Sequence, residues 1–497
     1  MERTDVIVIG GGVAGLTAAG LLAARGLEVV LLEKQARPGG YVGGFERKGF
    51  VFDTTGAFVS ACAPGDAFHD ILGRIGVADR IDFLPIRTVR NLFPDFEIET
   101  DYRSPSAYLE AVQRTFPARA GALARYGRLT ERLGRAFLAF ETAPAWKRAL
   151  LPLTFPTLLR HAWRSHGRVL HAFFGDDPRI RGALSALPTT VPPASLSYAF
   201  VAVLWAKVLG SGVFYPRGGM RALAEALTLG VTENGGRIDC GREVAAIRRE
   251  GRRAVGVGLS DGTELRARWV VGAMNPFRGE RLLDPETSLY GPRHRLDRYT
   301  PSGSALLYYV GVPPGVLPPS WPYFTSLQTE TDPGVLHRRI ENGELERGLL
   351  LVITTATVVD PSLAPAGHHT LKVLVHAPRA DVFEACYPNT GDRDRLRARV
   401  FEAIRDRTGV DLAGTALFVE EATPLTLRDR TGNEGGAMYG LDASCSQVGP
   451  RRPPNRTALD RLFWAGHYTH PSHGIVGSAL SGSFAARRVL VEAGEGP

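Results

Sequence analysis

The chain has 497 residues, 44% hydrophobic and 22% charged, which is the composition of an ordinary folded protein too long for one hydrophobic core. Its net charge of +8 comes from scattered arginines rather than from a basic stripe with interleaved aromatic residues, so we expect no nucleic-acid partner. The four cysteines are far apart and include no C-x-x-C pair, which indicates neither a zinc site nor a disulfide framework and fits a reducing cytosol.

The N-terminus enters its first predicted strand within a few residues of Met1, which leaves no room for a signal peptide. No run of about 18 charge-free apolar residues could span a membrane. We therefore expect a cytoplasmic protein, soluble or peripheral on the inner face of the membrane. The sequence does not specify an oligomeric state.

The first predicted unit is a strand, a glycine turn, a helix and a second strand. Residues 6–9 form an apolar strand, the turn occupies residues 10–15, and the helix follows at 16–25. In this pattern Gly10 makes the tight turn, Gly12 lets backbone N–H groups approach phosphates, and Gly15 allows close packing of helix on sheet. The phosphates then face a helix N-terminus.

Glu33 follows the second strand, residues 28–32, about 20 residues beyond the glycines. A carboxylate at this distance suits a ribose hydroxyl rather than a 2′-phosphate. The unit therefore predicts an adenine dinucleotide, FAD or NAD. Two glycine doublets come next, within residues 39–44, before a predicted strand at 50–56, and they indicate close approach of the backbone to a ligand.

Residues 104–206 are predicted to be mostly helical, because apolar residues recur at three- and four-residue spacing, and to belong to a second domain. Within them, residues 145–174 hold no Asp or Glu and interleave tryptophan, leucine and phenylalanine with basic residues. The basic residues are Lys147, Arg148, Arg160, Arg164 and Arg168. Such a surface is typical of segments that bind anionic lipid headgroups, although a solvated helix face accounts for it nearly as well. Residues 194–206 are apolar and charge-free, as in a core or in the wall of a tunnel for a lipophilic ligand.

Strand and helix patterns alternate through the rest of the chain. They predict a helix at 221–229, an antiparallel β segment at 237–259, a buried strand at 269–273, strands at 302–310, 348–357 and 369–377, an amphipathic helix at 392–407, a strand at 462–466 and a helix at 475–492. The strand at 269–273 and the C-terminal strand, loop and helix are expected to return the chain to the nucleotide domain.

In this order, the motifs resemble the FAD-dependent amine oxidase superfamily, and within it the branch of phytoene desaturases, carotenoid isomerases and retinol saturases. Besides the glycine motifs and Glu33, the resemblance is carried by segments at 49–53, 215–220, 270–276, 438–441 and 466–477 and by Ser481-Gly482. It implies an α/β fold in which a Rossmann-type FAD-binding domain, like that of glutathione reductase, is interleaved with an α+β substrate domain. The expected FAD-binding parts are residues 1–85, 214–290 and 425–497, and the expected substrate-domain parts are residues 86–213 and 291–424.

The resemblance also implies which residues contact FAD. It assigns Gly10, Gly12 and Gly15 to the pyrophosphate, Glu33 to the adenosine ribose, Gly39 and Gly40 to the diphosphate and the flavin side, Val244 to the adenine, and Gly466, Ile475 and Val476 to the ribityl chain and flavin ring. The remaining expected cofactor contacts are Val13, Ala14, Lys34, Tyr41, Gly56, Ala273, His467 and Gly474. A helix N-terminus near residues 474–477 would stabilise negative charge on the reduced flavin.

Two residues depart from the pattern of the superfamily. Tyr41 stands where the glycine doublet is often followed by Arg, and His467 stands where many relatives have an acid. His467, His470 and His473 recur at every third position, but no carboxylate accompanies them, so we predict no metal site.

The candidate catalytic residues are His467, Tyr439 and Tyr215. Either tyrosine could face the isoalloxazine, and a buried tyrosine whose hydroxyl is bonded to backbone is an equally good interpretation of each.

The predicted function is hydride transfer from a lipophilic polyene to FAD, as in phytoene desaturases. Because an apolar substrate offers no handle for acid–base chemistry, orientation would supply most of the catalysis and no general base is obligatory. The alternatives are a polyene isomerase or saturase that uses reduced FAD, a flavin amine or amino-acid oxidase, and a non-enzymatic escort-type binder of the same fold.

Overall fold

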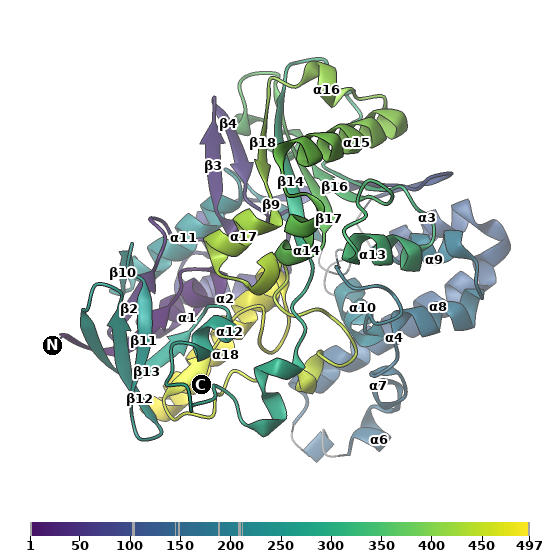
Figure 1. The fold of residues 1–497 in the computed structure, drawn as a ribbon. Coiled ribbons are helices and arrows are strands. Elements are labelled where there is room, and N and C mark those ends of the chain that lie inside the picture. Colours follow the sequence, from purple (N-terminus) through teal and green to yellow (C-terminus); the bar gives the residue numbers. More distant parts are fainter. Residues whose placement is uncertain are drawn as a thin grey trace.

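The computed structural model describes residues 2–101, 105–144, 146–147, 150–186, 189–206, 210 and 212–495. Arg148, one of the basic residues predicted to face lipid, lies outside the described residues, as do Ala145 and Ser104, where two predicted segments begin. The described chain folds around two large sheets with a group of helices beside them (Figure 1).

The first sheet is built mainly from parallel strands. Across the sheet they are β10 (Arg237–Cys240), β2 (Val29–Glu33), β1 (Glu2–Ile9), β13 (Glu264–Gly272), β12 (Arg253–Leu259) and β11 (Val244–Glu250), and β19 (Leu462–Trp464) also pairs with β13. The strands β10, β2, β1, β13 and β19 run parallel, whereas β12 and β11 are antiparallel additions. The strand β2 is buried along its whole length, as expected for a parallel strand covered on both faces.

The prediction of an antiparallel segment at 237–259 was wrong for its first strand. Strand β10 pairs with β2 in parallel, from Arg237 opposite Val30 to Cys240 opposite Glu33. Its four residues follow the helix α11 (Met220–Glu233), so the chain crosses over before it re-enters the sheet. A strand this short carries no pattern that separates parallel from antiparallel pairing.

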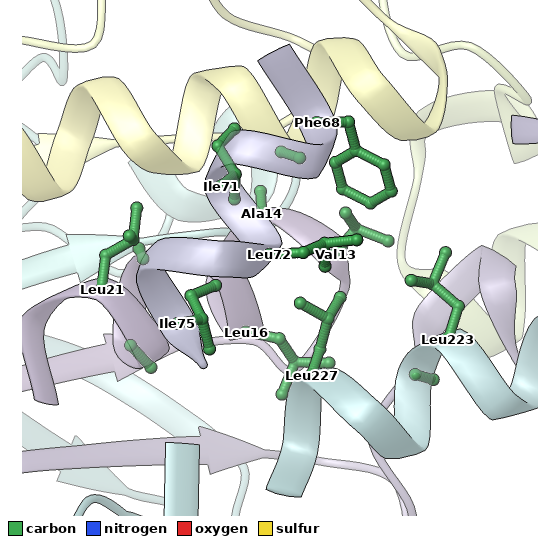
Figure 2. Packing of buried hydrophobic residues seen from close by; sticks show 14 of the residues in the cluster. Val13, Ala14, Leu16, Leu21, Phe68, Ile71, Leu72, Ile75, Leu223 and Leu227 are labelled. Atoms are coloured by element: carbon green, nitrogen blue, oxygen red, sulfur yellow. The ribbon is translucent and has the colours of Figure 1, made fainter. Parts of the chain in front are cut away.

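Three helices pack on the first sheet, α1 (Val13–Ala23), α11 and α18 (Gly474–Ala493), and α2 (Ala67–Ile75) packs on all three of them. Figure 2 shows the contact among α1, α2 and α11, where Leu16 lies near Leu227 and Ile75. Every residue of α1 is buried, because α18 covers it as well. A Cβ added at Gly482 of α18 would lie 2.3 Å from the carbonyl oxygen of Ala14, so the two helices touch through backbone.

The second sheet is mixed and lies beside the first. Its strands, in order, are β18 (Phe418–Ala422), β14 (Ser304–Val312), β17 (His369–Ala377), β16 (Leu350–Thr354), β15 (Phe324–Gln328), β7 (Thr88–Leu92) and β8 (Glu97–Asp101). The helices of this region are α13 (Pro333–Glu341), α14 (Ala380–Cys386), α15 (Thr390–Thr408), α16 (Leu412–Thr415) and α17 (Pro424–Thr431). The amphipathic helix predicted at 392–407 is α15, which buries Leu396, Val400 and Ile404 against this sheet.

The predicted helical middle segment forms a group of helices on the side of the molecule away from the first sheet (Figure 1). These helices are α3 (Pro105–Thr115), α4 (Ala120–Thr142), α6 (Leu151–Thr154), α7 (Pro156–His161), α8 (His166–Phe174), α9 (Pro178–Leu184) and α10 (Tyr198–Leu204). Their own core includes Tyr126 of α4 and Tyr198 of α10.

Smaller elements connect the layers. They are β3 (Gly44–Arg47) paired with β4 (Phe50–Asp53), the three-stranded sheet of β5 (Val59–Ser60), β9 (Val213–Pro216) and β6 (Phe83–Ile86), and the helix α12 (Pro276–Glu280).

The predicted α/β class is confirmed, with each large sheet assembled from segments far apart in the sequence.

Candidate functional site

The turn between β1 and α1 leaves an open space where a phosphate would lie. At Gly10, φ is +103°, and an added Cβ would lie 2.8 Å from the carbonyl oxygen of Ala273. At Gly15, an added Cβ would lie 1.9 Å from the carbonyl oxygen of Gly10, so only glycine fits. At Gly12, by contrast, no atom lies within 4 Å of an added Cβ. Gly12 precedes α1 without a side-chain cap, so the helix presents its N-terminal N–H groups to this space.

Glu33 holds this turn from the end of β2. Its Oε2 accepts a hydrogen bond from the N–H of Gly11 at 2.6 Å, and its Oε1 accepts one from the N–H of Gln35 at 2.8 Å. Each carboxylate oxygen has a second lone pair, so the buried Glu33 can also accept from ribose hydroxyls.

The loop at residues 39–42 lies against the first glycine turn. The N–H of Gly39 donates to the carbonyl of Gly11 at 2.8 Å, and Gly12 and Gly39 form a parallel bridge. Positive φ angles of +129° at Gly39 and +55° at Gly40 bend this loop around the space. The two glycine motifs therefore form one cradle.

The C-terminal strand, loop and helix close the other side of the cradle. Gly466 follows β19 with φ +120°, and its N–H donates to Oγ of Ser481 at 3.0 Å. The helix α18 begins at Gly474 without a side-chain cap and has no acidic residue in its first turn. Its N-terminal end is therefore a region of positive potential at the wall of the site.

Arg452 is a buried cation that holds the loop before α18. Its guanidinium donates to the carbonyl oxygens of Thr469 (3.0 Å), Gln447 (3.4 Å) and His467. Burial lowers the pKa of Arg452 to about 10, which leaves it charged at neutral pH. Its hydrogen-bond partners are backbone carbonyls, so its charge adds to the positive potential at the end of α18, although the nearby carboxylate of Asp442 offsets part of it.

A single cavity of about 1530 Å³ connects this cradle with the helical region. Ligand pockets for one small molecule measure roughly 300–1,000 Å³, so the space exceeds what one such ligand fills. The part of the cavity within the helical region, called the apolar arm below, is lined by apolar side chains of α4, α7 and α10 and the turn after α7. They are Phe137, Phe140, Leu158, Leu159, Ala162, Trp163, Ala199, Phe200, Val203 and Leu204. The helix α10, within the apolar segment 194–206, contributes both to the core, through Val201 and Ala202, and to the cavity wall, through Phe200 and Leu204.

Most of the predicted cofactor residues line this one cavity. They are Gly10, Gly12, Val13, Ala14, Glu33, Lys34, Gly39, Gly40, Tyr41, Gly56, Val244, Ala273, Gly466, His467, Gly474, Ile475 and Val476. Gly15 does not line it, and its role is the close packing already described.

Tyr215, a candidate catalytic residue, does not line the cavity and is buried, as the second of its two interpretations expected. Its hydroxyl donates to Oδ2 of Asp53 at 2.7 Å, and its ring is buried behind the cavity wall. Oδ1 of Asp53 accepts from the N–H of Met220 at 2.7 Å. The partner of Tyr215 is therefore a carboxylate, and the geometry gives this tyrosine no access to a ligand in the cavity.

Lys372 supports the loop at residues 54–57. Its ammonium donates to the carbonyl oxygens of Thr55 (3.1 Å) and Gly56, and Asp53 lies close enough to interact electrostatically. Burial lowers the pKa of Lys372 to about 8. Because Gly56 lines the cavity, this buried lysine fixes part of the wall.

His467 and Tyr439 both line the cavity. Burial, with a contribution from the nearby Arg452, lowers the pKa of His467 to about 3, so its imidazole is neutral at pH 7. Burial raises the pKa of Tyr439 to about 12, so its hydroxyl stays protonated. Tyr41 occupies the place of the common Arg, with its ring centroid 5.8 Å from that of His467 and its hydroxyl bonded to the carbonyl of Ala437 at 2.9 Å.

No group of three or more His, Cys, Asp or Glu side chains that could hold a metal ion occurs in the described part of the chain. Among the helices of the described residues, none is long and apolar enough to cross a membrane.

Residues 13–490 match the family described as flavin containing amine oxidoreductase. The chain belongs to this family. It is an FAD-dependent oxidoreductase, as the motifs predicted. The open space at Gly12, the uncapped N-terminus of α1, Glu33 and the size of the cavity all fit FAD.

Relatives within this family resemble the chain along nearly its full length. The all-trans-zeta-carotene desaturase of Myxococcus xanthus is 30% identical, over 99% of this chain and 94% of the relative. The chloroplastic prolycopene isomerase of Arabidopsis thaliana is 25% identical, over 99% of this chain and 83% of the relative. The structure of a cyclohexylamine oxidase from Brevibacterium oxydans shares the fold, with a TM-score of 0.66 and 16% identity over 99% of this chain and 100% of that chain. The likeness to the desaturase and isomerase branch is confirmed.

Sequence reasoning assigned no role to Arg452, Lys372 or His376, although Arg452 and His376 line the cavity and Lys372 braces its wall. Each comes from a segment without a glycine motif, and the hydrogen-bond partners of Arg452 and Lys372 are backbone carbonyls. A charged residue inside an apolar strand, as at Lys372 in β17, was the one available signal.

Proposed function

We propose that this flavoenzyme oxidises a lipophilic polyene, as a desaturase does, with FAD as the hydride acceptor. The observation that carries the proposal is the apolar arm, which is continuous with the cradle of glycines. The desaturase names of several relatives support the same substrate class.

When bound, FAD supplies a two-electron acceptor that takes a hydride from the substrate. The residues of the chain supply binding and electrostatics. The apolar side chains of α4, α7 and α10 orient a substrate that has no polar handle and keep water away from it. The N-terminus of α18 and the guanidinium of Arg452 favour negative charge at the adjoining wall, which promotes transfer of a hydride toward it.

The test is anaerobic mixing of the FAD-loaded protein with phytoene, ζ-carotene or a panel of amines, followed by absorbance at about 450 nm. Bleaching by a polyene is the expected result, and bleaching by amines alone would refute the proposal. A change in double-bond geometry that requires chemically reduced FAD would instead assign the chain to the isomerases.

We also infer that the substrate enters from a lipid surface, through the end of the apolar arm. The large exposed apolar side chains of this region are Trp146 (61% exposed), Leu150 (47%), Leu153 (79%), Leu159 (48%) and Trp163 (42%). Leu159 and Trp163 are both exposed and line the cavity, so the cavity reaches the surface beside them, and Trp146, Leu150 and Leu153 are close to them in sequence. An apolar surface gathered at one entrance indicates a binding surface.

Basic side chains accompany this surface, which favours an anionic bilayer over an apolar protein partner. Arg451 stacks on Trp163 with its guanidinium carbon 3.8 Å from the ring centroid, and Lys147 lies over Trp146 at 5.4 Å. Arg160 and Arg164 are exposed nearby in sequence. Tryptophan and leucine beside lysine and arginine are the composition of helices that lie in the membrane interface.

Flotation of the protein with vesicles tests this inference. We expect binding to vesicles that contain anionic lipid, and loss of binding in the double variant W146S/L153S. The matched control is L417S, which replaces a leucine that is 49% exposed on another part of the molecule. Equal flotation of all three proteins, or of none, would refute a lipid-facing entrance.

A further inference from the structure

His473 lies where the apolar arm meets the loop before α18, the part of the cavity at which we expect the flavin ring. It directly precedes α18 and lines the cavity. Its ring centroid is 4.9 Å from that of Phe200, which belongs to the apolar arm, and 4.9 Å from that of Tyr439. A substrate that reaches from the arm toward FAD therefore passes this imidazole.

The two ring nitrogens of His473 have different surroundings. Among the described residues, Nδ1 is shielded from solvent and has no hydrogen-bond partner, whereas Nε2 is not shielded. The side chain also does not cap α18, although it stands at the capping position. A histidine held beside a cavity without a structural hydrogen bond calls for an explanation.

The proposed oxidation needs a proton acceptor as well as a hydride acceptor. Two neighbouring carbons each lose one hydrogen when a single bond becomes a double bond. One hydrogen leaves with its electron pair as a hydride, which oxidised FAD accepts, and the other leaves as a proton while its bonding pair forms the new π bond. The substrate loses two electrons, FAD gains two, and a base must hold the proton.

We propose that Nε2 of His473 accepts this proton, which makes His473 a catalytic base of the reaction. This inference rests on the proposed function and deepens it. It also changes the expectation from the sequence, under which no general base was needed. The proton stays on the imidazole until it is released to solvent.

The groups around His473 keep it available as a base. Burial is the main cause that lowers its pKa well below 6.5, and the charge of Arg452 and the neighbouring His467 lower it further. Tyr439 is protonated and neutral at pH 7. The imidazole is therefore unprotonated before reaction. A weak base is sufficient, because departure of the hydride leaves an allylic cation whose adjacent C–H bonds are strongly acidic.

The test compares FAD-loaded wild type, H473Q and H470Q by the rate of flavin bleaching with phytoene or ζ-carotene. His470 is the matched control, because it belongs to the same loop but stacks on Phe484 and does not line the cavity. We expect H473Q to hold as much FAD as wild type and to bleach at least about 100-fold more slowly, the scale of a lost general base. We expect H470Q to stay within about 3-fold of wild type. A rate in H473Q within 3-fold of that in H470Q would overturn the assignment.

Two further measurements separate a chemical from a structural role. In apoprotein with ¹³C-labelled histidine, the resonance of His473 is the one that is absent from H473Q. Its chemical shift should be that of a neutral imidazole down to pH 6.5 or lower. Added imidazole should restore bleaching in H473A but change nothing in H470A. A protonated imidazole at pH 7, or absence of rescue in FAD-loaded H473A, would contradict the role as a base.

The outcomes distinguish this inference from the function on which it rests. If wild type holds FAD but no polyene bleaches it, the proposed function and the base both fail. If polyenes bleach wild type and H473Q alike, only the base fails. Should H473Q lose FAD, the rate of flavin bleaching in wild type, measured as a function of pH, tests the base instead. The rate must fall as pH drops through the pKa of the base, and a rate that falls only as pH rises would overturn the inference.

Discussion

Replacement of Lys372 by Met tests whether a buried cation holds the cavity wall. The ammonium donates two hydrogen bonds, to the carbonyls of Thr55 and Gly56, and lies near the buried carboxylate of Asp53. Methionine has a similar length but no donor. K372M leaves the carboxylate of Asp53 and two carbonyl oxygens buried without their cation, and loss of one partner of a buried pair should lower the free energy of unfolding by about 3 kcal/mol. Because Gly56 lines the cavity, the same change should weaken FAD binding.

The assay is urea unfolding of apoprotein followed by circular dichroism, with K48M as the control. Lys48 is exposed, so its loss should change stability by less than about 1 kcal/mol even though it lies 5.3 Å from the ring of Phe418. The double variant K372M/D53N should be less destabilised than the sum of the single variants, because the remaining partner is no longer a buried charge. Equal stability of K372M and K48M, or additivity within about 0.5 kcal/mol in the double variant, would refute the reasoning.

The pH dependence has a definite sign. Burial holds the pKa of Lys372 at about 8 in the folded protein, against 10.5 in an ordinary environment. Between these values the unfolded chain binds more protons than the folded one, so the contribution of Lys372 to stability rises with pH. Below pH 8 both states are protonated and the contribution is constant. The stability of wild type minus that of K372M should therefore be flat up to about pH 8 and rise from there to about 10.5, and a decline in that window would contradict the assigned burial.

Three other substitutions have definite expected results. G12A should fold normally, since no atom lies within 4 Å of an added Cβ, but should bind FAD more weakly by fluorescence titration because the methyl group enters the cradle. G15A should lose bound flavin and much of its thermal stability, since its Cβ would lie 1.9 Å from the carbonyl oxygen of Gly10, and equal behaviour of the two variants would show that the cradle is misplaced. R452M should make the flavin reduction potential more negative in a redox titration, because a buried positive charge is lost. An unchanged potential in FAD-loaded R452M would contradict this contribution.

The parts of the site that the sequence predicted are the parts that local chemistry determines. The conformation of the turn at residues 10–15 follows from a strand, a helix and the absence of Cβ atoms, all within a short stretch of chain. The placement of Glu33 follows from the spacing of that same unit. Such features can be inferred from residues that lie next to one another.

The parts that sequence reasoning missed depend on contacts between distant residues. The sequence does not show that the hydroxyl of Tyr215 donates to Asp53, which is 162 residues away in the chain. Lys372 braces a loop more than 300 residues before it. Arg452 bonds to carbonyl oxygens, which every residue has, so no partner type in the sequence could reveal its role. The direction of β10 was likewise set by the strand beside it, not by its own four residues.

The strand order of the first sheet also has a consequence for the folding of the protein during its synthesis. The strand β13 needs β1 from the beginning of the chain and β19 from its end, and α1 is covered by α18. At ribosomal speeds of 5–20 residues per second, a chain of 497 residues takes about 25–100 s to synthesise. Throughout that time the apolar strand at residues 6–9 and the helix that follows it remain without their last partners. Stable flavin binding therefore requires that β19 and α18 have been made, and nascent chains cut short before residue 462 are expected to be substrates for chaperones and proteases rather than partly active enzymes.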